Sequence, residues 1–219
     1  MKRVFFRTPE VFDHVLGNVN DIIAKRPDAK ICEIVVFTPP GDGGMNSPIG
    51  KTKDEIDYGW QTNLKYTRNL SVADGRVDAE GLADIFYNMG PEEAMGISSR
   101  RTAPGTVIDD SIGYCSPSMH TSMIDFRCDE PEEAIHTMER MGVDIRGSDV
   151  VLLDSGISFH AHIPGVVNKE IDAESYLDTL EHVDSVCQKW VPLQRKQGYQ
   201  LLRVSPSLQK PRIPVALDI

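Results

Sequence analysis

The order of strand and helix signals in the second half of the chain constrains the fold most. Runs of alternating or continuous apolar residues predict strands over 120–127, 149–154, 157–163 and 199–205. Helical spacing lies between the first two strands and again between the last two. The order β-α-β-β-α-β is typical of the RRM or ferredoxin-like fold. In that fold the first and third strands are central neighbours, and the fourth strand flanks the first.

Turn and capping residues divide these elements. Pro131 predicts the start of the first helix, and Gly142 predicts its end. Ser155-Gly156 predicts a tight turn between the second and third strands, and Pro164-Gly165 predicts the end of the third. Asp172 is expected to cap the second helix.

The first half predicts an α/β module with long loops. Thr8 and Pro9 begin a helix that stops before Pro27, and a buried strand follows over 30–37. A further helix is expected over 79–89. The fold class is therefore α+β, with an N-terminal module (1–117) packed against the RRM-like core (118–219) as one compact unit.

Composition and charge exclude several classes of protein. The 219 residues carry a formal net charge of −10, which argues against a protein that coats nucleic acid or a basic membrane-surface protein. No apolar run reaches the ~20 residues that a membrane span needs, and the N-terminus does not read as a signal peptide. The four cysteines form no CxxC or CxxH pair. Reduced thiols and a cytoplasmic location, without membrane association, are expected.

The acidic chain ends in a basic segment. No aspartate or glutamate lies between Ser185 and Leu217. Six basic residues lie there: Lys189, Arg195, Lys196, Arg203, Lys210 and Arg212. The segment predicts either a surface for a localised anionic partner or an ordinary solvated basic face.

One face of the predicted sheet gathers polar side chains. Because side chains alternate between the two faces of a strand, Ile124, Phe126 and Phe159 are expected to face the helices. The opposite face receives polar residues from three strands: Asp125, Arg127, Ser158, His160, His162 and Arg203. In a one-layer protein this is the solvated face, but the first half of the chain is long enough to cover it.

Three chemistries fit such a face to different degrees. An RNA-recognition sheet needs exposed aromatic residues on its central strands, and here those positions hold Asp, Arg and His. His160 and His162 form an HxH pair that can ligate a metal, but the repeated βα units of barrel hydrolases are missing. Phosphate or nucleotide binding fits best, because His and Arg donate to phosphate oxygens and a carboxylate holds a divalent metal.

Three segments resemble motifs of the archaeo-eukaryotic-type primases. Residues 155–163, SGISFHAHI, resemble the second motif of that family, small-x-His. Residues 123–127, MIDFR, stand where the family has two hydrophobic residues followed by Asp-x-Asp. Residues 202–210, LRVSPSLQK, resemble the family's LRxxxSLHxKTG segment. The resemblance covers the C-terminal half and implies a primase-polymerase-like fold.

The resemblance also implies roles for individual residues. Asp125 and His160 would be catalytic, and Asp125 with Asp129 would hold Mg²⁺ or Mn²⁺. Phosphates would be bound by Ser158, His160, Arg127, Arg203 and Lys210. Arg127 stands where the family has its second acid, and a guanidinium repels the cations that two carboxylates would hold.

Three functions are consistent with these residues. The first is a primase-polymerase-like nucleotidyltransferase that handles nucleoside triphosphate, nucleic acid or both, with a divalent metal. The alternative is a catalytically degenerate primase-like module that binds nucleotide or nucleic acid without extending it. The third is a structural protein whose polar sheet face docks a partner. A second metal-binding acid distinguishes the first from the second, so the sequence leaves open whether the protein is an enzyme.

Overall fold

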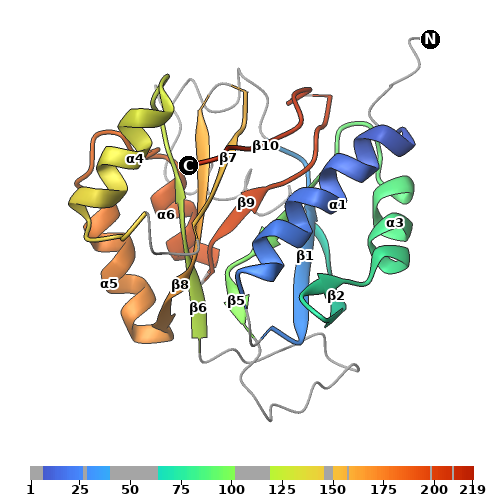
Figure 1. The fold of residues 1–219 in the computed structure, drawn as a ribbon, viewed down its shortest axis with the longest axis horizontal. Coiled ribbons are helices and arrows are strands. Elements are labelled where there is room, and N and C mark those ends of the chain that lie inside the picture. Colours follow the sequence, from blue (N-terminus) through green and yellow to red (C-terminus); the bar gives the residue numbers. More distant parts are fainter. Residues whose placement is uncertain are drawn as a thin grey trace.

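A computed structural model describes most of the chain (Figure 1). The described residues are 7–26, 29–39, 64–101, 119–145, 150–156, 158–197, 199–208 and 210–219. They form an α+β fold with two five-stranded antiparallel sheets. In Figure 1, helices α4 and α5 lie at one end of the molecule and α1 and α3 at the other, with the strands between them.

The first sheet is built mainly from the N-terminal half and has the order β3-β2-β1-β4-β9. Its strands are β1 (Ile31–Phe37), β2 (Leu64–Ala73), β3 (Arg76–Val77), β4 (Ala94–Ser98) and β9 (Leu201–Arg203). Helices α1 (Pro9–Ala24) and α3 (Ala79–Asn88) belong to this half. The Thr8 hydroxyl accepts a hydrogen bond from the amide of Val11, as expected of the predicted N-cap. The predictions of α1, β1 and α3 are confirmed.

The second sheet has the order β10-β7-β8-β6-β5. Its strands are β5 (Arg100–Arg101), β6 (Met119–Asp125), β7 (Val151–Asp154), β8 (Phe159–Lys169) and β10 (Val215–Ala216). The helices of this half are α4 (Pro131–Arg140), α5 (Glu170–Leu180) and α6 (Trp190–Gln197). The predicted element order is present, with α6 in addition, and β6 and β8 are neighbours as expected.

The fourth predicted strand does not join this sheet. β9 pairs with β4 of the first sheet, and β5, just after β4, takes the position beside β6. Ser99 lies at the change of partner: its amide donates to the Gln200 carbonyl, and its carbonyl accepts from Thr121, both at 2.8 Å. β9 still lies near β6, because the Gln200 side chain accepts from the Met123 amide at 2.6 Å.

Two predicted boundaries are wrong in this region. β8 does not end at Pro164-Gly165 but continues to Lys169. The ladder with β6 takes up the extra residues in one register shift, since Ser122 pairs with Ile163 and Thr121 with Val167. Because the long strand leads directly into α5 at Glu170, Asp172 lies inside that helix and not at its cap.

The main hydrophobic core contains residues from both halves of the chain. Val15 of α1, Ile34 of β1, Met123 of β6 and Leu152 of β7 are fully buried members of one cluster. Both sheets therefore share one apolar interior, which fixes the ends of β6, β8 and β9 relative to one another. Of the helices in the described ranges, none is long and apolar enough to cross a membrane.

Candidate functional site

The candidate site lies where β6, β8 and β9 meet. Asp125 and His160 are direct partners in the β6–β8 ladder, so their side chains share one face of the sheet. Ile124 and Phe126 are buried in the core, as the predicted alternation requires. The two residues that carry the sequence hypothesis are therefore neighbours.

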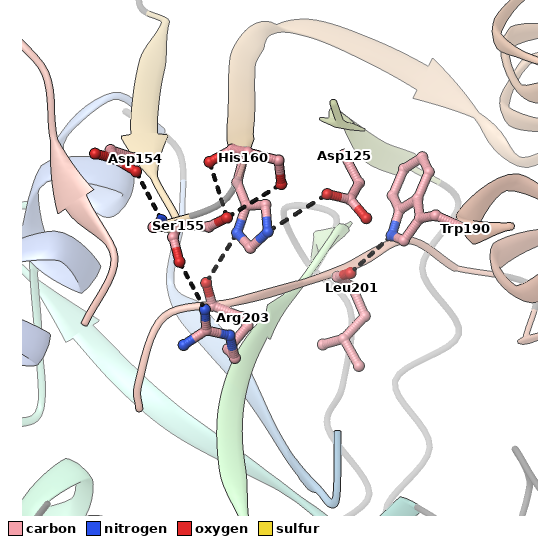
Figure 2. Close-up of polar contacts among 9 residues, drawn as sticks. Asp125, Asp154, Ser155, His160, Trp190, Leu201 and Arg203 are labelled. Atoms are coloured by element: carbon pink, nitrogen blue, oxygen red, sulfur yellow. Dashed lines mark hydrogen bonds and ion pairs between the residues drawn. The ribbon is translucent and has the colours of Figure 1, made fainter. Parts of the chain in front are cut away.

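His160 connects two strands through its imidazole ring (Figure 2). Nδ1 lies 3.2 Å from the carbonyl oxygen of Arg203, and Nε2 lies 3.5 Å from Oδ1 of Asp125. A carbonyl oxygen only accepts, so Nδ1 carries the hydrogen and donates it. Burial lowers the pKa of His160 to about 3, and the charges of Arg203 and Lys210 act in the same direction. The ring is therefore neutral at pH 7, and Nε2 keeps its lone pair.

Asp125 is the acidic group of the site. Burial raises the pKa of its carboxyl to about 7, although a hydrogen bond with the Cys187 side chain and the charges of Arg203 and Lys210 lower it. The Asp125 side chain keeps 21% of its surface exposed, and that of His160 keeps 10%. Asp125 is therefore partly accessible to solvent, whereas His160 is buried.

The Arg203 guanidinium binds main-chain carbonyls. Nη1 donates to Ser205 at 2.8 Å and to Arg212 at 3.0 Å. Nη2 donates to Ser155 at 3.2 Å (Figure 2). Burial lowers the pKa of Arg203 to about 10, so the group stays charged at pH 7. Arg203 thus ties the β7–β8 turn and the C-terminal segment (residues 205–217) to the end of β9.

A second arginine, Arg212, also contacts the β7–β8 turn. Gly156 has a φ of 98°, and a Cβ atom there would lie 2.2 Å from Cδ of Arg212. Arg212 donates to the Gly156 carbonyl. Within the turn, the Ser155 hydroxyl donates to the Ser158 carbonyl at 2.8 Å and lies 3.2 Å from the Ser158 hydroxyl. Ser158 is thereby held just before His160 on the chain.

Lys210 lies in a loop after β9 that closes on Ser207. The amide of Ser207 donates to the Lys210 carbonyl at 2.9 Å, and the amide of Lys210 donates back at 3.2 Å. Arg7 donates to the Pro206 carbonyl at 3.2 Å, which ties the loop to the start of α1. The charge of Lys210 lowers the pKa of both Asp125 and His160. Lys210 therefore contributes positive charge to the field that acts on these two residues.

Arg127 and Asp129 lie outside this group. β6 ends at Asp125, two residues before the predicted end. Beyond Asp125 the chain pairs with the segment around Val186 instead of continuing its ladder with β8. Phe126 forms a bridge with Val186, and the Arg127 amide donates to the Ser185 carbonyl at 2.7 Å. The side chains of Arg127 and Asp129 are exposed. In the described part of the chain, no group of three or more His, Cys, Asp or Glu side chains is placed to hold a metal ion.

Two cations of the basic segment are engaged within the fold. Arg203 is buried, and Arg195 forms ion pairs with Asp178 and Glu181. The local excess of positive charge at the site comes from Arg203 and Lys210.

Sequence reasoning missed several groups that complete the site. Cys187 contacts Asp125 through its side chain, and its amide donates to the Asp125 carbonyl at 2.7 Å. Two side chains of α6 form hydrogen bonds with the main chain of Leu201 in β9. Trp190 donates to the Leu201 carbonyl at 3.1 Å (Figure 2), and the Leu201 amide donates to the Gln194 side chain at 2.6 Å. No local motif marks these residues, because their partners are distant in sequence.

The chain was compared with protein-family models, curated proteins and solved structures, and none of the three comparisons finds a match.

Proposed function

We propose that the protein is a nucleotide-binding module on a primase-polymerase-like scaffold, and that it binds a phosphate-bearing ligand without transferring it. The observation that carries this proposal is the contact between Asp125 and His160 beside two cations, Arg203 and Lys210. The ligand is a nucleoside triphosphate or the phosphate-bearing end of a nucleic acid.

The scaffold part of the proposal rests on topology and on residue position. β6 and β8 are neighbours, and the Asp125 and His160 of the two primase-like motifs are direct ladder partners. The charge of Lys210, in the third segment, acts on the same two residues. The pairing of β9 with β4 is the departure from the expected RRM-like sheet.

Charge favours an anionic ligand. Among the described residues, Asp125 is an acid whose charge acts on Arg203, and its pKa of about 7 leaves it partly protonated at neutral pH. Arg203 and Lys210 remain positive beside it. We expect the Lys210 ammonium to contact the phosphate through its charge; the Arg203 guanidinium already binds three carbonyls. Arg203 instead adds long-range attraction from its buried position.

The metal-binding side chains among the described residues do not fit a two-metal centre. Two-metal phosphoryl transfer needs several carboxylates to hold cations a few ångströms apart. Among the described residues, Asp125 is the acid that contacts His160, and Asp129 lies in the exposed stretch before α4. Binding without extension is therefore the better supported of the two primase-like functions.

Calorimetric titration with ATP, GTP and inorganic triphosphate tests the proposal. Loss of a charge-assisted hydrogen bond costs about 1.5–3 kcal/mol, so Lys210→Ala should weaken binding by about ten- to 150-fold. Arg195→Ala is the matched control, because Arg195 belongs to the same basic segment but pairs with Asp178 and Glu181. Failure of all three ligands to bind the wild-type protein at millimolar concentration would refute the proposal.

An extension assay separates binding from transfer. The protein is incubated with nucleoside triphosphates, a primed template and Mg²⁺ or Mn²⁺, and we expect no extended product. Extension that disappears in Asp125→Asn would establish the nucleotidyltransferase instead.

A further inference from the structure

The outer edge of β2 is open along most of its length. On one side β2 pairs with β1. On the other side β3 pairs with Val72 and Ala73, and the Asp78 amide donates to the Ser71 carbonyl at 2.9 Å. In the described part of the chain, the edge before Ser71 has no partner strand. This open edge runs from Leu64 to Leu70, and we call it the β2 window.

The β1–β2 ladder shows which main-chain groups of the β2 window face outwards. The amide of Val72 donates to the Lys30 carbonyl at 2.9 Å, so the N–H of Val72 points toward β1. Main-chain groups alternate in direction along an antiparallel strand. Those of Lys65, Thr67 and Asn69 therefore point away from β1. Each of the three residues offers one donor and one acceptor at the open edge.

The β2 window is complementary to a second copy of itself. Thr67 lies at its centre, so an antiparallel copy would place Thr67 opposite Thr67 and Lys65 opposite Asn69 of the other copy. All three outward-facing residues would then exchange main-chain hydrogen bonds with the second strand. That strand would end where β3 begins, so β3 would keep its place beside Val72 and Ala73.

The side chains of the β2 window favour the same register. Tyr66 would lie opposite Arg68 of the other copy, and a guanidinium is attracted to an aromatic ring. Tyr66 is 44% exposed, and Thr67 and Arg68 are exposed too, so these side chains are accessible to a second copy. Free cations on an edge strand oppose pairing with another strand. Arg68 instead forms an ion pair with Asp84 of α3, which offsets its charge.

We propose that the protein forms a two-fold symmetric dimer in which the β2 windows of two copies pair as antiparallel strands. The first sheets of the two copies become one continuous sheet across the axis. A contact between two strand edges is small, so the dimer is weak and forms at high protein concentration. β9, which carries Arg203, lies at the opposite end of the strand order, so the dimer does not depend on the proposed nucleotide-binding function.

Analytical ultracentrifugation over roughly 10–500 µM protein tests the proposal. We expect the average mass to rise from that of a monomer toward that of a dimer. Thr67→Pro removes the central outward-facing amide, and proline is tolerated in an edge strand where its nitrogen faces away from the sheet. This variant should therefore keep its fold, checked by circular dichroism, and remain monomeric. Thr67→Val is the matched control, because it keeps the amide and a branched side chain and should dimerise like the wild type.

Two side-chain variants test the register without changing the main chain. Tyr66→Arg places a second cation opposite Arg68 of the other copy, and we expect about two- to 30-fold weaker dimerisation. Arg68→Glu removes the contact with the Tyr66 ring and should weaken the dimer as well. In a mixture of the two variants, the new arginine lies opposite the new glutamate. The mixture should therefore associate more tightly than either variant alone.

Three results would overturn the proposal. The first is a wild-type protein that stays monomeric at roughly 500 µM. The second is a folded Thr67→Pro variant that dimerises like the wild type, because the copies would then meet through another surface. The third is a mixture of Tyr66→Arg and Arg68→Glu that associates no better than the separate variants, which would exclude this register.

Discussion

His160 and His162 are two residues apart on one strand, yet their surroundings differ. His160 donates to a carbonyl and keeps part of its surface exposed. His162 is 0% exposed, and among the described residues neither of its ring nitrogens has a hydrogen-bond partner. An unpartnered buried polar group costs stability. The HxH pattern therefore contains one histidine with polar partners on two neighbouring strands and one that the fold tolerates.

Replacement of His162 by leucine should stabilise the protein, and more so in acid. Burial lowers the pKa of His162 well below 6.5, and the charge of Arg26 adds to this effect. Below pH 6.5 the unfolded state therefore binds a proton that the folded state does not, and the wild-type protein loses stability. His162→Leu should gain about 1 kcal/mol at pH 7.5 and about 1 kcal/mol more at pH 5.5.

Urea unfolding of both proteins at the two pH values measures this difference. His160 and Asp125 titrate in both proteins, so their contributions cancel in the comparison. Equal differences at pH 7.5 and 5.5 would show that His162 accepts a proton in the folded state.

Gly156→Ala should destabilise the β7–β8 turn through Arg212. The new Cβ would overlap the Arg212 side chain, and a φ of 98° is itself unfavourable for alanine. We expect a loss of about 1–3 kcal/mol by thermal or urea unfolding. Gly142→Ala is the control, because Gly142 also has a positive φ, of 80°, but nothing lies within 4 Å of its Cβ position. An equal loss in both variants would mean that Arg212 moves aside freely.

Residue alternation predicted part of the site but not its hydrogen bonds. Period-two spacing was sufficient to place Asp125 and His160 on one face. Arg203 was assigned to a phosphate because its charge was the visible signal. Its partners Ser155 and Arg212 lie 48 and 9 residues away in sequence, and main-chain carbonyls leave no mark in a sequence pattern.

At the scale of elements, locally encoded segments were predicted and long-range pairings were not. The helix α1 has a cap, a proline at its start and a regular apolar stripe, and β1 is a continuous apolar run. β2 is mostly exposed along its first half, so its pattern was too weak to identify. The predicted partner of β9 was β6, but β9 pairs with β4. The RRM-like strand order was applied to the second half of the chain alone, and it left out β4, which also offers a free strand edge.

Arg203 connects the end of β9 with the β7–β8 turn and the C-terminal segment. Its replacement should therefore lower the free energy of unfolding far more than the replacement of an exposed arginine. Arg203→Gln would leave buried carbonyls at the β7–β8 turn and the C-terminal segment without their donor, and we expect a loss of about 3 kcal/mol. Arg195→Gln breaks only exposed ion pairs on α5 and α6 and should cost less than about 1 kcal/mol. Chemical unfolding of the two variants measures both losses. Similar small losses would show that the carbonyls find other donors.

The whole molecule has one principal core, although its strands form two sheets. β4 and β5 lead from one sheet to the other at Ser99, and buried residues of α1, β1, β6 and β7 belong to one cluster. The candidate site lies at this junction, with Asp125 and His160 from one sheet and Arg203 from the other. Any loosening of the first sheet should therefore also disturb the second.

Ile97→Ala tests whether the two sheets unfold together. Ile97 is fully buried in β4, between Ile34 of β1 and Leu202 of β9, and its truncation should cost about 2–5 kcal/mol. If the shared core makes folding cooperative, hydrogen exchange should accelerate equally in β1 and in β6 and β8, which do not contain the substitution. Val215→Ala is the control, since Val215 is half exposed on the edge strand β10. Faster exchange confined to the first sheet would mean that each sheet folds alone.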